Sequence, residues 1–229
     1  MKQVTVIIPV KDEEEGLLFL VDDFRSSILY NDSSIQLSFI IDGRTSDNSK
    51  SVARKLSDSI IDQEETHGKG AAIRQAIEEW KKDPTPYVVF LDADGSYSFD
   101  SVVDVISALK AGADAVSGSR FMQSEGRPKG MSRTHNIGNK ILSMISSIRN
   151  RRKISDLCTG LWGFNSKAIN SIEIDAQGFD LEAELAGKMS RNHFVHKEIA
   201  VQWSQRKGGK SKLRSVRDGF IILLRILRT

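Results

Sequence analysis

The stretch Val88–Tyr97 reads VVFLDADGSY and provides the best starting point for interpreting the chain. The apolar run before Asp92 is typical of a strand buried in a parallel sheet. In an extended chain Asp92 and Asp94 would project to the same side, because alternate side chains share a face. Two carboxylates at the C-terminal end of a strand suit Mg²⁺ or Mn²⁺, with substrate phosphates completing the shell. The alternative is a solvated turn, since Asp, Gly and Ser are common turn residues.

Composition narrows the class of protein. The chain has 229 residues, of which 39% are hydrophobic and 28% charged, as expected for a globular domain rather than a disordered chain. A net charge of +3 is too small to indicate nucleic-acid binding, so we expect no nucleic-acid partner. Cys158 is the single cysteine, which excludes an internal disulfide and fits a reducing, cytoplasmic location. We find no signal-peptide pattern and no apolar run of membrane-spanning length.

Short apolar runs alternate with amphipathic segments through the first hundred residues. Such an order predicts an α/β fold with a mostly parallel, Rossmann-like sheet and helices on both faces. The predicted strands are 2–10, 35–41, 59–62 and the run that begins at 88, and the predicted helices are 12–30, 45–56 and 71–82.

The second half of the chain continues the pattern and ends in a helix. We expect helices at 100–110, 134–149, 178–190 and 213–228, strands at 113–117, 161–165 and 194–203, and a polar loop at 123–133. Neither an internal repeat nor a low-complexity linker interrupts the chain. The economical division is one catalytic domain, residues 1–212, followed by an amphipathic C-terminal helix, residues 213–229.

Several chemistry-bearing residues follow predicted strands. Asp42 ends the second strand, Arg120 follows the strand after the acidic pair, and Lys69 lies between glycines just before a helix. Because the carboxyl ends of parallel strands share one edge of a sheet, these side chains should meet in one crevice. Acids for a metal, bases for phosphates and a helix N-terminus together suit a nucleotide diphosphate.

The order of these motifs resembles a family-2 glycosyltransferase of the GT-A fold, within it the polyprenyl-phosphate hexose synthases such as the dolichyl-phosphate mannose synthases. The resemblance runs from about residue 4 to 213. Its motifs are IIPVKDEE at 7–14, DGRTSD at 42–47, GKG at 68–70, DAD at 92–94, GSR at 118–120, SR at 132–133, DLCTG at 156–160, Arg206 and GKSKL at 209–213.

The resemblance implies roles for individual positions. Nucleotide-sugar binding would fall to Pro9, Asp12, Glu13, Asp42, Lys69, Asp92, Ala93 and Asp94, with Asp92 and Asp94 also holding the metal. The phosphates, including the acceptor's, would face Arg120, Arg133, Arg206 and Lys212. Asp94, Arg120, Asp156 and Glu182 would lie at the transfer site. Asp12 replaces the usual asparagine and Gly43 a common second aspartate, which bears on the identity of the base.

The acceptor can be argued from proton chemistry. A hydroxyl acceptor needs a general base, whereas a phosphate monoester is largely dianionic at neutral pH and needs cations instead. Residues 206–214 supply such cations directly before an apolar helix flanked by arginines, a pattern typical of an anionic membrane surface. The sequence therefore predicts an inverting enzyme that moves mannose or glucose from GDP-mannose or UDP-glucose to a polyprenyl (dolichyl) phosphate. It would act peripherally on the cytoplasmic face of a membrane, where a separate membrane subunit is a candidate partner.

Three other functions fit parts of the sequence. A family-2 glycosyltransferase with a hydroxyl acceptor (a glycan, lipid or small polyol) would make Asp156 or Glu182 an essential base. A haloacid-dehalogenase-like phosphatase shares the DADGS pattern at 92–96, but that motif opens its domain, whereas here three β/α units precede it. A basic module that binds nucleic acid or membrane would need only the charged tail. For Trp162, Phe164 and Trp203 we expect core positions rather than sugar platforms.

Overall fold

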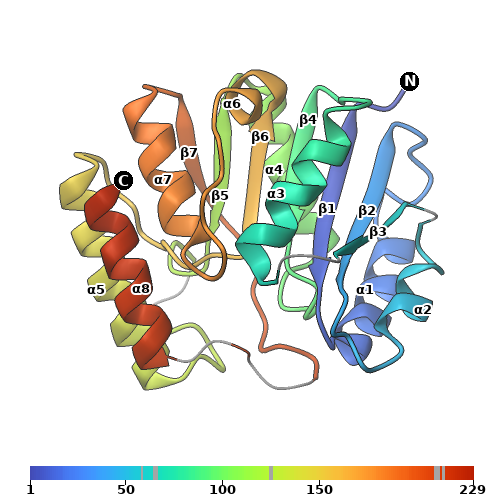
Figure 1. Cartoon of the computed structure of the whole chain (residues 1–229), viewed down its shortest axis with the longest axis horizontal. Coiled ribbons are helices and arrows are strands. Elements are labelled where there is room, and N and C mark those ends of the chain that lie inside the picture. The colour runs from blue at the N-terminus through green and yellow to red at the C-terminus, as the bar shows by residue number, and fades with distance from the viewer. Residues whose placement is uncertain (58, 64–66, 124–125, 209–211, 213–214) are drawn as a thin grey trace.

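A seven-stranded sheet between two helical layers forms the protein (Figure 1). The computed structural model covers residues 1–229 and describes all of them except 58, 64–66, 124–125, 209–211 and 213–214. The strands are β1 (Val4–Val10), β2 (Ile35–Asp42), β3 (Ile60–Gln63), β4 (Tyr87–Leu91), β5 (Ala115–Ser119), β6 (Leu161–Asn165) and β7 (His196–Ala200). The helices are α1 (Glu14–Ser26), α2 (Ser49–Ala53), α3 (Lys69–Trp80), α4 (Phe99–Lys110), α5 (Arg133–Arg149), α6 (Ser166–Asn170), α7 (Leu181–Arg191) and α8 (Ser215–Arg228).

The sheet is mostly parallel, as the sequence predicts. Its strand order is β3-β2-β1-β4-β6-β5-β7, and β6 runs antiparallel to both of its neighbours. Gly163 of β6 pairs with Val89 on one side and Val116 on the other, so β6 joins the two halves of the sheet. The other strands share one direction, and their C-terminal ends therefore line one edge.

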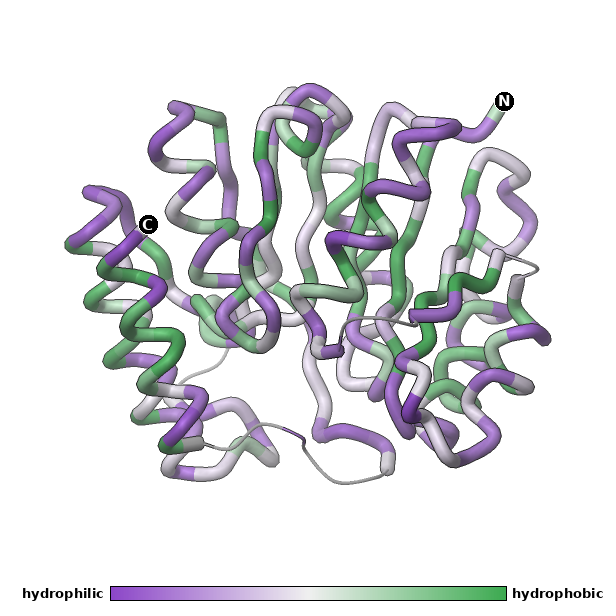
Figure 2. The backbone as a smooth tube through the Cα atoms, in the orientation of Figure 1, coloured by the Kyte–Doolittle hydropathy of each residue, from purple (hydrophilic) through white to green (hydrophobic). Residues whose placement is uncertain are grey.

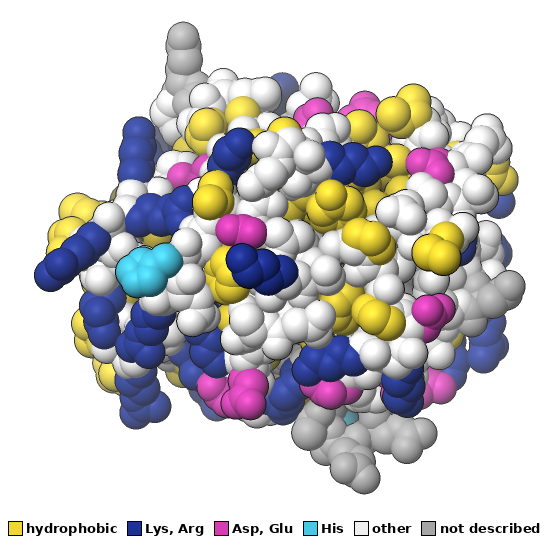
Figure 3. Space-filling model, turned by 90° about the horizontal axis from the view of Figure 1, so that it is seen from above, with side chains coloured by type: hydrophobic (Ala, Val, Ile, Leu, Met, Phe, Trp, Pro, Cys, Tyr) yellow, Lys and Arg dark blue, Asp and Glu magenta, His cyan; other side chains and the backbone are white. Residues whose placement is uncertain are grey.

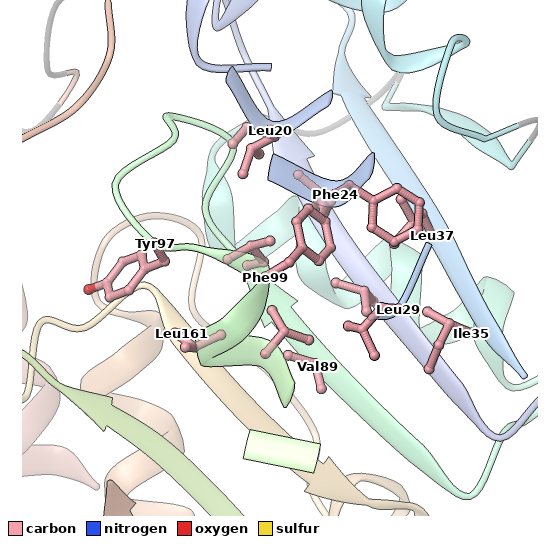
Figure 4. Close-up of a cluster of buried hydrophobic side chains, with 14 of the residues drawn as sticks. Leu20, Phe24, Leu29, Ile35, Leu37, Val89, Tyr97, Phe99 and Leu161 are labelled. Atoms are coloured by element: carbon pink, nitrogen blue, oxygen red, sulfur yellow. The ribbon is translucent and has the colours of Figure 1, made fainter. Parts of the chain in front are cut away.

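One face of the sheet packs against α1, α2 and α4. Figure 4 shows part of this core, in which the Phe24 and Phe99 rings lie 4.7 Å apart between centroids. The Tyr97 ring belongs to the same cluster, but its hydroxyl points away from the other labelled side chains (Figure 4). That hydroxyl lies 3.2 Å from the Thr159 hydroxyl and accepts a hydrogen bond from the Gly160 amide. Tyr97 thus links the core to the loop before β6.

The opposite face packs against α3, α6, α7 and α8. Trp162 and Phe164 of β6 are buried there, which confirms the core positions expected for them. Ile222 and Ile226 of α8 are buried in the same cluster. The C-terminal helix is therefore docked on the domain by its apolar face, since burying such side chains is favourable.

Some predicted boundaries differ from the structure. The helix expected at 45–56 is confined to α2 because Asp47 accepts bonds from the Ser49 amide and hydroxyl and starts the helix there. The strand expected at 113–117 becomes β5, which begins at Ala115 since the Asp114 carboxylate bonds to Val195 and Asn165. The strand expected at 194–203 is limited to β7, and α6 was not predicted.

The outer side of the molecule is formed by α5 and α8, which pack against each other (Figure 1). Both helices alternate hydrophobic and hydrophilic residues along their length (Figure 2). Among the described residues we find no helix with the length and apolarity needed to cross a membrane. Seen from above, on the side away from the C-terminal strand ends, basic and acidic side chains are scattered among small apolar groups (Figure 3).

Candidate active site

A cavity of about 750 Å³ lies at the C-terminal ends of the parallel strands. Its walls come from the ends of β1, β2, β4 and β5, the starts of α3 and α7, one side of α5 and α8, and the described residues Trp203, Gln205, Arg206 and Lys212. Most of the residues predicted from the sequence line it: Pro9, Glu13, Asp42, Lys69, Asp92, Ala93, Asp94, Arg120, Glu182, Arg206 and Lys212.

Asp42, at the end of β2, is surrounded by cationic groups. Its carboxylate accepts three hydrogen bonds from Arg44, from the amide, Nε and Nη2 at 2.9–3.0 Å. Lys11 Nζ lies 3.9 Å away and His67 Nδ1 3.5 Å away. Burial would raise the pKa of Asp42, but the bonds from Arg44 outweigh it and lower that pKa to about 2. Asp42 is thus a charged acceptor at neutral pH, suited to the N–H groups of a nucleobase.

Lys69 joins two carboxylates that lie far apart in the chain. Its ammonium lies 2.6 Å from Asp92 Oδ1 and 2.6 Å from Glu182 Oε1, and we call these three side chains the Lys69 cluster. Burial would lower the pKa of Lys69, but attraction to Asp92 and Glu182 outweighs it and raises that pKa. Burial raises the pKa of Asp92 and of Glu182, and Lys69 opposes both shifts. The cluster is a buried, paired set of charges held between α3, β4 and α7.

Asp92 is packed closely against Gly160. A Cβ built on Gly160 would lie 1.8 Å from Asp92 Oδ2, so only glycine leaves room for this carboxylate. The Asp92 side chain is nevertheless 30% exposed to the cavity, and that of Asp94 is 22% exposed. Both carboxylates of the acidic pair therefore reach the cavity, with one Asp92 oxygen taken by Lys69.

The acidic pair fits a hard divalent cation that substrate phosphates also bind. Asp94 Oδ1 accepts a bond from the Ser96 amide, and Oδ2 faces the Arg206 guanidinium at 3.5 Å. The described residues contain no group of three His, Cys, Asp or Glu side chains arranged for a metal. A Mg²⁺ ion needs no such cage, because it is commonly held by one or two carboxylates together with phosphates.

The Glu13 carboxylate binds two basic side chains from the C-terminal part of the chain, Arg206 and Lys212. Arg206 Nη2 bonds to its carboxylate at 2.7 and 2.9 Å, and Lys212 Nζ at 2.5 Å. We call Glu13, Asp94, Arg206 and Lys212 the Arg206 cluster. Burial raises the pKa of Glu13, against the opposing effect of Lys212 and Arg206. Arg206 and Lys212 are thereby held in the cavity wall, next to the acidic pair.

Arg120 forms a buried bidentate pair with Asp156. The Nε–Oδ2 and Nη2–Oδ1 distances are both 2.6 Å, and Asn139 of α5 donates to Oδ1 at 2.6 Å. The Arg120 guanidinium also lies 5.9 Å from the centre of the Trp203 ring, which is a cation–π contact. The core position expected for Trp203 is not what the structure shows: unlike the buried Trp162, Trp203 is half-buried and lines the cavity, where its ring faces Arg120.

Some predicted residues are not at the cavity surface. Asp156 is buried behind Arg120, and Asp12 lies beside the cavity, where its carboxylate accepts a bond from the Ser46 amide at 2.7 Å. Arg133 is exposed at the start of α5 and is not part of the lining. The motif at 209–213 falls largely outside the described residues, and so do parts of the loop at 123–133.

Sequence reasoning missed several residues of the site. Arg44 and Tyr97 line the cavity, and Asn139 bonds to Asp156. Asn139 had a readable signal, because it begins a polar stripe with Ser143 and Ser146 at helical spacing, and all three are buried. Arg44 follows Asp42 closely in sequence, but nothing in the pattern indicated that its side chain turns back onto that carboxylate.

The model of the family described as Glycosyl transferase family 2 matches residues 5–172. The matched region contains the acidic pair, Asp42, Lys69 and Arg120. The chain therefore belongs to glycosyltransferase family 2.

Similar curated proteins include several glycosyltransferases. The chain is 26% identical to glycosyltransferase AglJ of Haloferax volcanii over 226 residues, covering 98% of this chain and 71% of that one. It is 23% identical to polyprenol monophosphomannose synthase of Mycolicibacterium smegmatis, covering 93% and 81%. Identity to dolichol-phosphate mannosyltransferase of Pyrococcus furiosus is 24%, covering 93% of this chain and 59% of that one.

Solved structures agree on the fold. Glucosyl-3-phosphoglycerate synthase from Mycobacterium tuberculosis in complex with phosphoglyceric acid matches with a TM-score of 0.76 at 14% identity, over 99% of this chain and 79% of that one. The same enzyme with Mn²⁺, UDP-glucose and glycerol 3-phosphate matches with a TM-score of 0.72 at 15% identity, covering 99% and 79%. At such identities the match shows the GT-A fold alone.

Proposed function

We propose that the protein is an inverting, metal-dependent glycosyltransferase that moves a hexose from a nucleotide diphosphate sugar to a polyprenyl phosphate. The proposal rests on one observation. Each carboxylate that could act as a general base is paired with a cation, and further cations line the cavity. The polyprenyl-phosphate relatives support the acceptor class, and the solved structures with UDP-glucose and Mn²⁺ support the donor class.

The donor would lie along the ends of β1, β2 and β4. Asp42 would accept from the base, with Pro9 and Glu13 at the neighbouring strand end, while Asp12 braces the loop that holds them. Asp94 and Asp92 would hold the metal. When bound, Mg²⁺ or Mn²⁺ neutralises charge on the leaving diphosphate. Ala93 keeps the two carboxylates apart at the cavity wall.

The transfer itself needs no proton acceptor. An oxygen of the acceptor phosphate would attack the anomeric carbon on the face opposite the leaving group and form the new carbon–oxygen bond. The bond from that carbon to the donor's diphosphate breaks, and the diphosphate oxygen keeps the electron pair. Because the phosphate monoester is already ionised at neutral pH, the step balances without deprotonation.

The carboxylates that could serve as a base are already engaged. Asp156 is bonded to Arg120 and Asn139, and Glu182 is bonded to Lys69. A hydroxyl acceptor would require one of them to be released, whereas a phosphate acceptor requires cations. Arg206 and Lys212 line the cavity, where they pair with Glu13, and would exchange that partner for the phosphate; Arg120 lines the same cavity. Arg133, at the exposed start of α5, would meet the phosphate only as it enters.

Peripheral contact with a membrane would bring a lipid phosphate to this cavity. Exposed apolar side chains extend along α5 and α8, with exposed Lys140, Arg149, Arg217 and Arg228 around them. Basic charge beside an apolar face favours an anionic bilayer surface. The exposed apolar residues of the two helices are Ile137, Ile141, Met144 and Ile148 on α5 and Val216, Phe220, Ile221 and Leu227 on α8. The cytoplasmic face, and a membrane subunit as partner, are parts of the same proposal.

The test is transfer of radiolabelled hexose to a short-chain polyprenyl phosphate, with GDP-mannose and UDP-glucose compared in the presence of Mn²⁺ or Mg²⁺. We expect labelled lipid from one donor, dependent on the metal and lost in Asp94→Ala. Metal-dependent hydrolysis of the donor without lipid labelling would indicate that the acceptor is a hydroxyl compound rather than a lipid phosphate. Failure of the protein to bind either donor would overturn the glycosyl-transfer proposal.

A further inference from the structure

We propose that Asn139 of α5 is a positioning residue for the acceptor phosphate, because it holds the Asp156 carboxylate that directs the Arg120 guanidinium at the cavity. The inference rests on the proposed function, which brings a phosphate to the cations of this cavity. Asn139 and Arg120 both line the cavity, whereas Asp156 is 1% exposed and is not part of the lining. Asn139 is itself buried, with 5% of its surface exposed.

The 154–158 loop around this carboxylate is held by side chains at each of its backbone amides. Three of the amides donate to Asn139, Ser143 and Ser147 of α5, at 2.9–3.2 Å. The other two donate to the Glu198 carboxylate of β7, at 2.9–3.2 Å. A backbone amide away from water needs such a partner, and a loop has no neighbouring strand to supply it. The polar stripe of α5 and one carboxylate of β7 therefore fix the position of this loop.

The side-chain amide of Asn139 suits both of its partners. Its Nδ2 donates to Asp156 Oδ1 at 2.6 Å, and its Oδ1 accepts from the Cys158 amide and the Ser143 hydroxyl, both at 3.2 Å. An amide supplies a donor and an acceptor side by side, whereas a carboxylate of the same shape only accepts and a leucine does neither. Asn139 thus fixes the carboxylate and the backbone of the loop together.

The fixed carboxylate in turn determines the direction of Arg120. Asp156 Oδ2 accepts from the Arg120 amide at 2.9 Å and from Nε at 2.6 Å, and Oδ1 accepts from Nη2 at 2.6 Å. The same Nη2 donates to the Cys158 carbonyl at 2.6 Å. An arginine held in this way has little rotamer freedom left to lose when a phosphate binds, which favours binding. Without Asn139 the carboxylate loses one of its donors, and Arg120 loses part of this order.

The chain offers a matched control at the opposite edge of the sheet. Asn165, the last residue of β6, donates from Nδ2 to Asp114 Oδ1 at 2.8 Å and accepts from the Ala168 amide at 2.8 Å. These are the two kinds of bond that Asn139 makes. Asn165 pairs with Tyr87, the first residue of β4, and is not part of the cavity lining. Asn165→Asp therefore disrupts a contact between an asparagine and a carboxylate without touching the acceptor site.

The test compares Asn139→Asp and Asn139→Leu with Asn165→Asp by steady-state transfer and urea denaturation. Asn139→Leu adds no charge, so it keeps the test available if Asn139→Asp does not fold. For both Asn139 variants we expect the KM for a short-chain polyprenyl phosphate to rise about 10-fold, the effect of losing one hydrogen bond to a charged group. The KM for the donor should stay within about twofold, and kcat at saturating acceptor within about threefold.

Asn165→Asp should destabilise the fold but leave both KM values within about twofold of the wild type. This comparison separates positioning from a merely structural role, because partial unfolding lowers the concentration of active enzyme and therefore kcat rather than KM. If the Asn139 variants lose kcat in proportion to their folded fraction and keep the acceptor KM of the wild type, the inference is overturned.

Phosphate binding is measured separately from transfer, so that the inference and the proposed function can fail independently. The probe is methyl phosphate, titrated by calorimetry with UDP or GDP and Mn²⁺ present. If the wild type transfers hexose and the Asn139 variants keep its acceptor KM, the function stands and the inference is wrong. If no hexose is transferred, but the Asn139 variants bind methyl phosphate about 10-fold more weakly and Asn165→Asp does not, Asn139 positions a phosphate site and the proposed function fails.

Discussion

The Lys69 cluster and the Arg206 cluster both pair carboxylates with basic side chains, but they lie in different settings. In the Lys69 cluster the lysine is 14% exposed, Glu182 8% and Asp92 30%, and these side chains come from two helices packed on the sheet and from the end of β4. In the Arg206 cluster Glu13 is 9% exposed and Asp94 22%, whereas Arg206 is 20% exposed and Lys212 30%, and neither of these two cations lies in a helix or strand. The Lys69 cluster is thus held by elements packed in the domain, whereas the cations of the Arg206 cluster come from outside the helices and strands and line the cavity.

This difference indicates that the two clusters contribute differently to the stability of the fold and to substrate binding. A buried pair that loses one partner leaves an uncompensated charge, so the Lys69–Glu182 pair should matter strongly for stability, while Asp92 also faces the cavity. Partly exposed pairs are screened and contribute little to stability, so the Arg206 cluster can exchange its partners for substrate phosphates. Asp94 shows the same contrast with Asp92, because its carboxylate lies 3.5 Å from Arg206 rather than in a tight pair with lysine.

The largest effect is expected at Asp94. Asp94→Asn removes the charge that would hold the metal, and hexose transfer should fall by about 1,000-fold or more, several kcal/mol of transition-state stabilisation. The measurement is the initial rate of transfer at saturating metal. Asp104→Asn is the matched control, because Asp104 is exposed on α4 and far from the lining. Equal rates for the two variants would contradict the role given to Asp94.

The next effect concerns the framework. Lys69→Met leaves Glu182 buried and Asp92 partly buried without their cation, and should lower the free energy of unfolding by about 3 kcal/mol. Urea denaturation measures it. Lys82→Met, which breaks an exposed pair with Glu79, is the control and should change stability by less than about 0.5 kcal/mol. A second change, Glu182→Gln, should recover part of the loss in the Lys69→Met background. If Lys69→Met lowered stability no more than Lys82→Met does, the contrast between the two clusters would be wrong.

Asp42 belongs to neither cluster, and it should make the stability of the fold depend on pH. Its pKa in the folded protein is about 2, below its ordinary value. The unfolded chain therefore binds the proton first as pH falls, and stability present above pH 4 is lost between about pH 4 and 2. We expect Asp42→Asn to reduce that acid-induced loss by about 1–2 kcal/mol. The comparison uses urea midpoints of the wild type and the variant measured from pH 5 to pH 2.5, and parallel curves would contradict it.

The smallest effect on stability is expected at Glu13. Glu13→Gln removes the charge that holds Arg206 and Lys212, yet it should cost only about 1 kcal/mol of stability, because both cations are partly exposed to water although Glu13 itself is buried. Its consequence should appear in the KM values for donor and acceptor, because Arg206 and Lys212 lose the carboxylate that holds them beside the cavity. Kinetics and denaturation on the same preparation separate the two effects. A stability loss equal to that of Lys69→Met would mean that both clusters are framework.

The sequence predicted most residues of the site, but it predicted few of the contacts between strands and between side chains. Apolar runs located most strands, and the residues after them, such as Asp42 and Asp92, reached the cavity because parallel strands end at one edge. The antiparallel direction of β6 could not be predicted, since alternation along a strand carries no information on its direction. Nor could the Lys69–Glu182 contact, which joins residues 113 positions apart. Asp156 was expected at the transfer site, but Arg120 covers it.

The most direct test of the central proposal is a competition in one tube. Wild-type protein, Mn²⁺ and the radiolabelled donor are mixed with equal concentrations of a short-chain polyprenyl phosphate and 3-phosphoglycerate, and the products are partitioned between organic and aqueous phases. We predict that the label enters the organic phase as a polyprenyl-phosphate hexose and that Asp94→Asn abolishes it. Label that accumulates only in an aqueous phosphoglycerate glycoside would contradict a lipid phosphate as the acceptor.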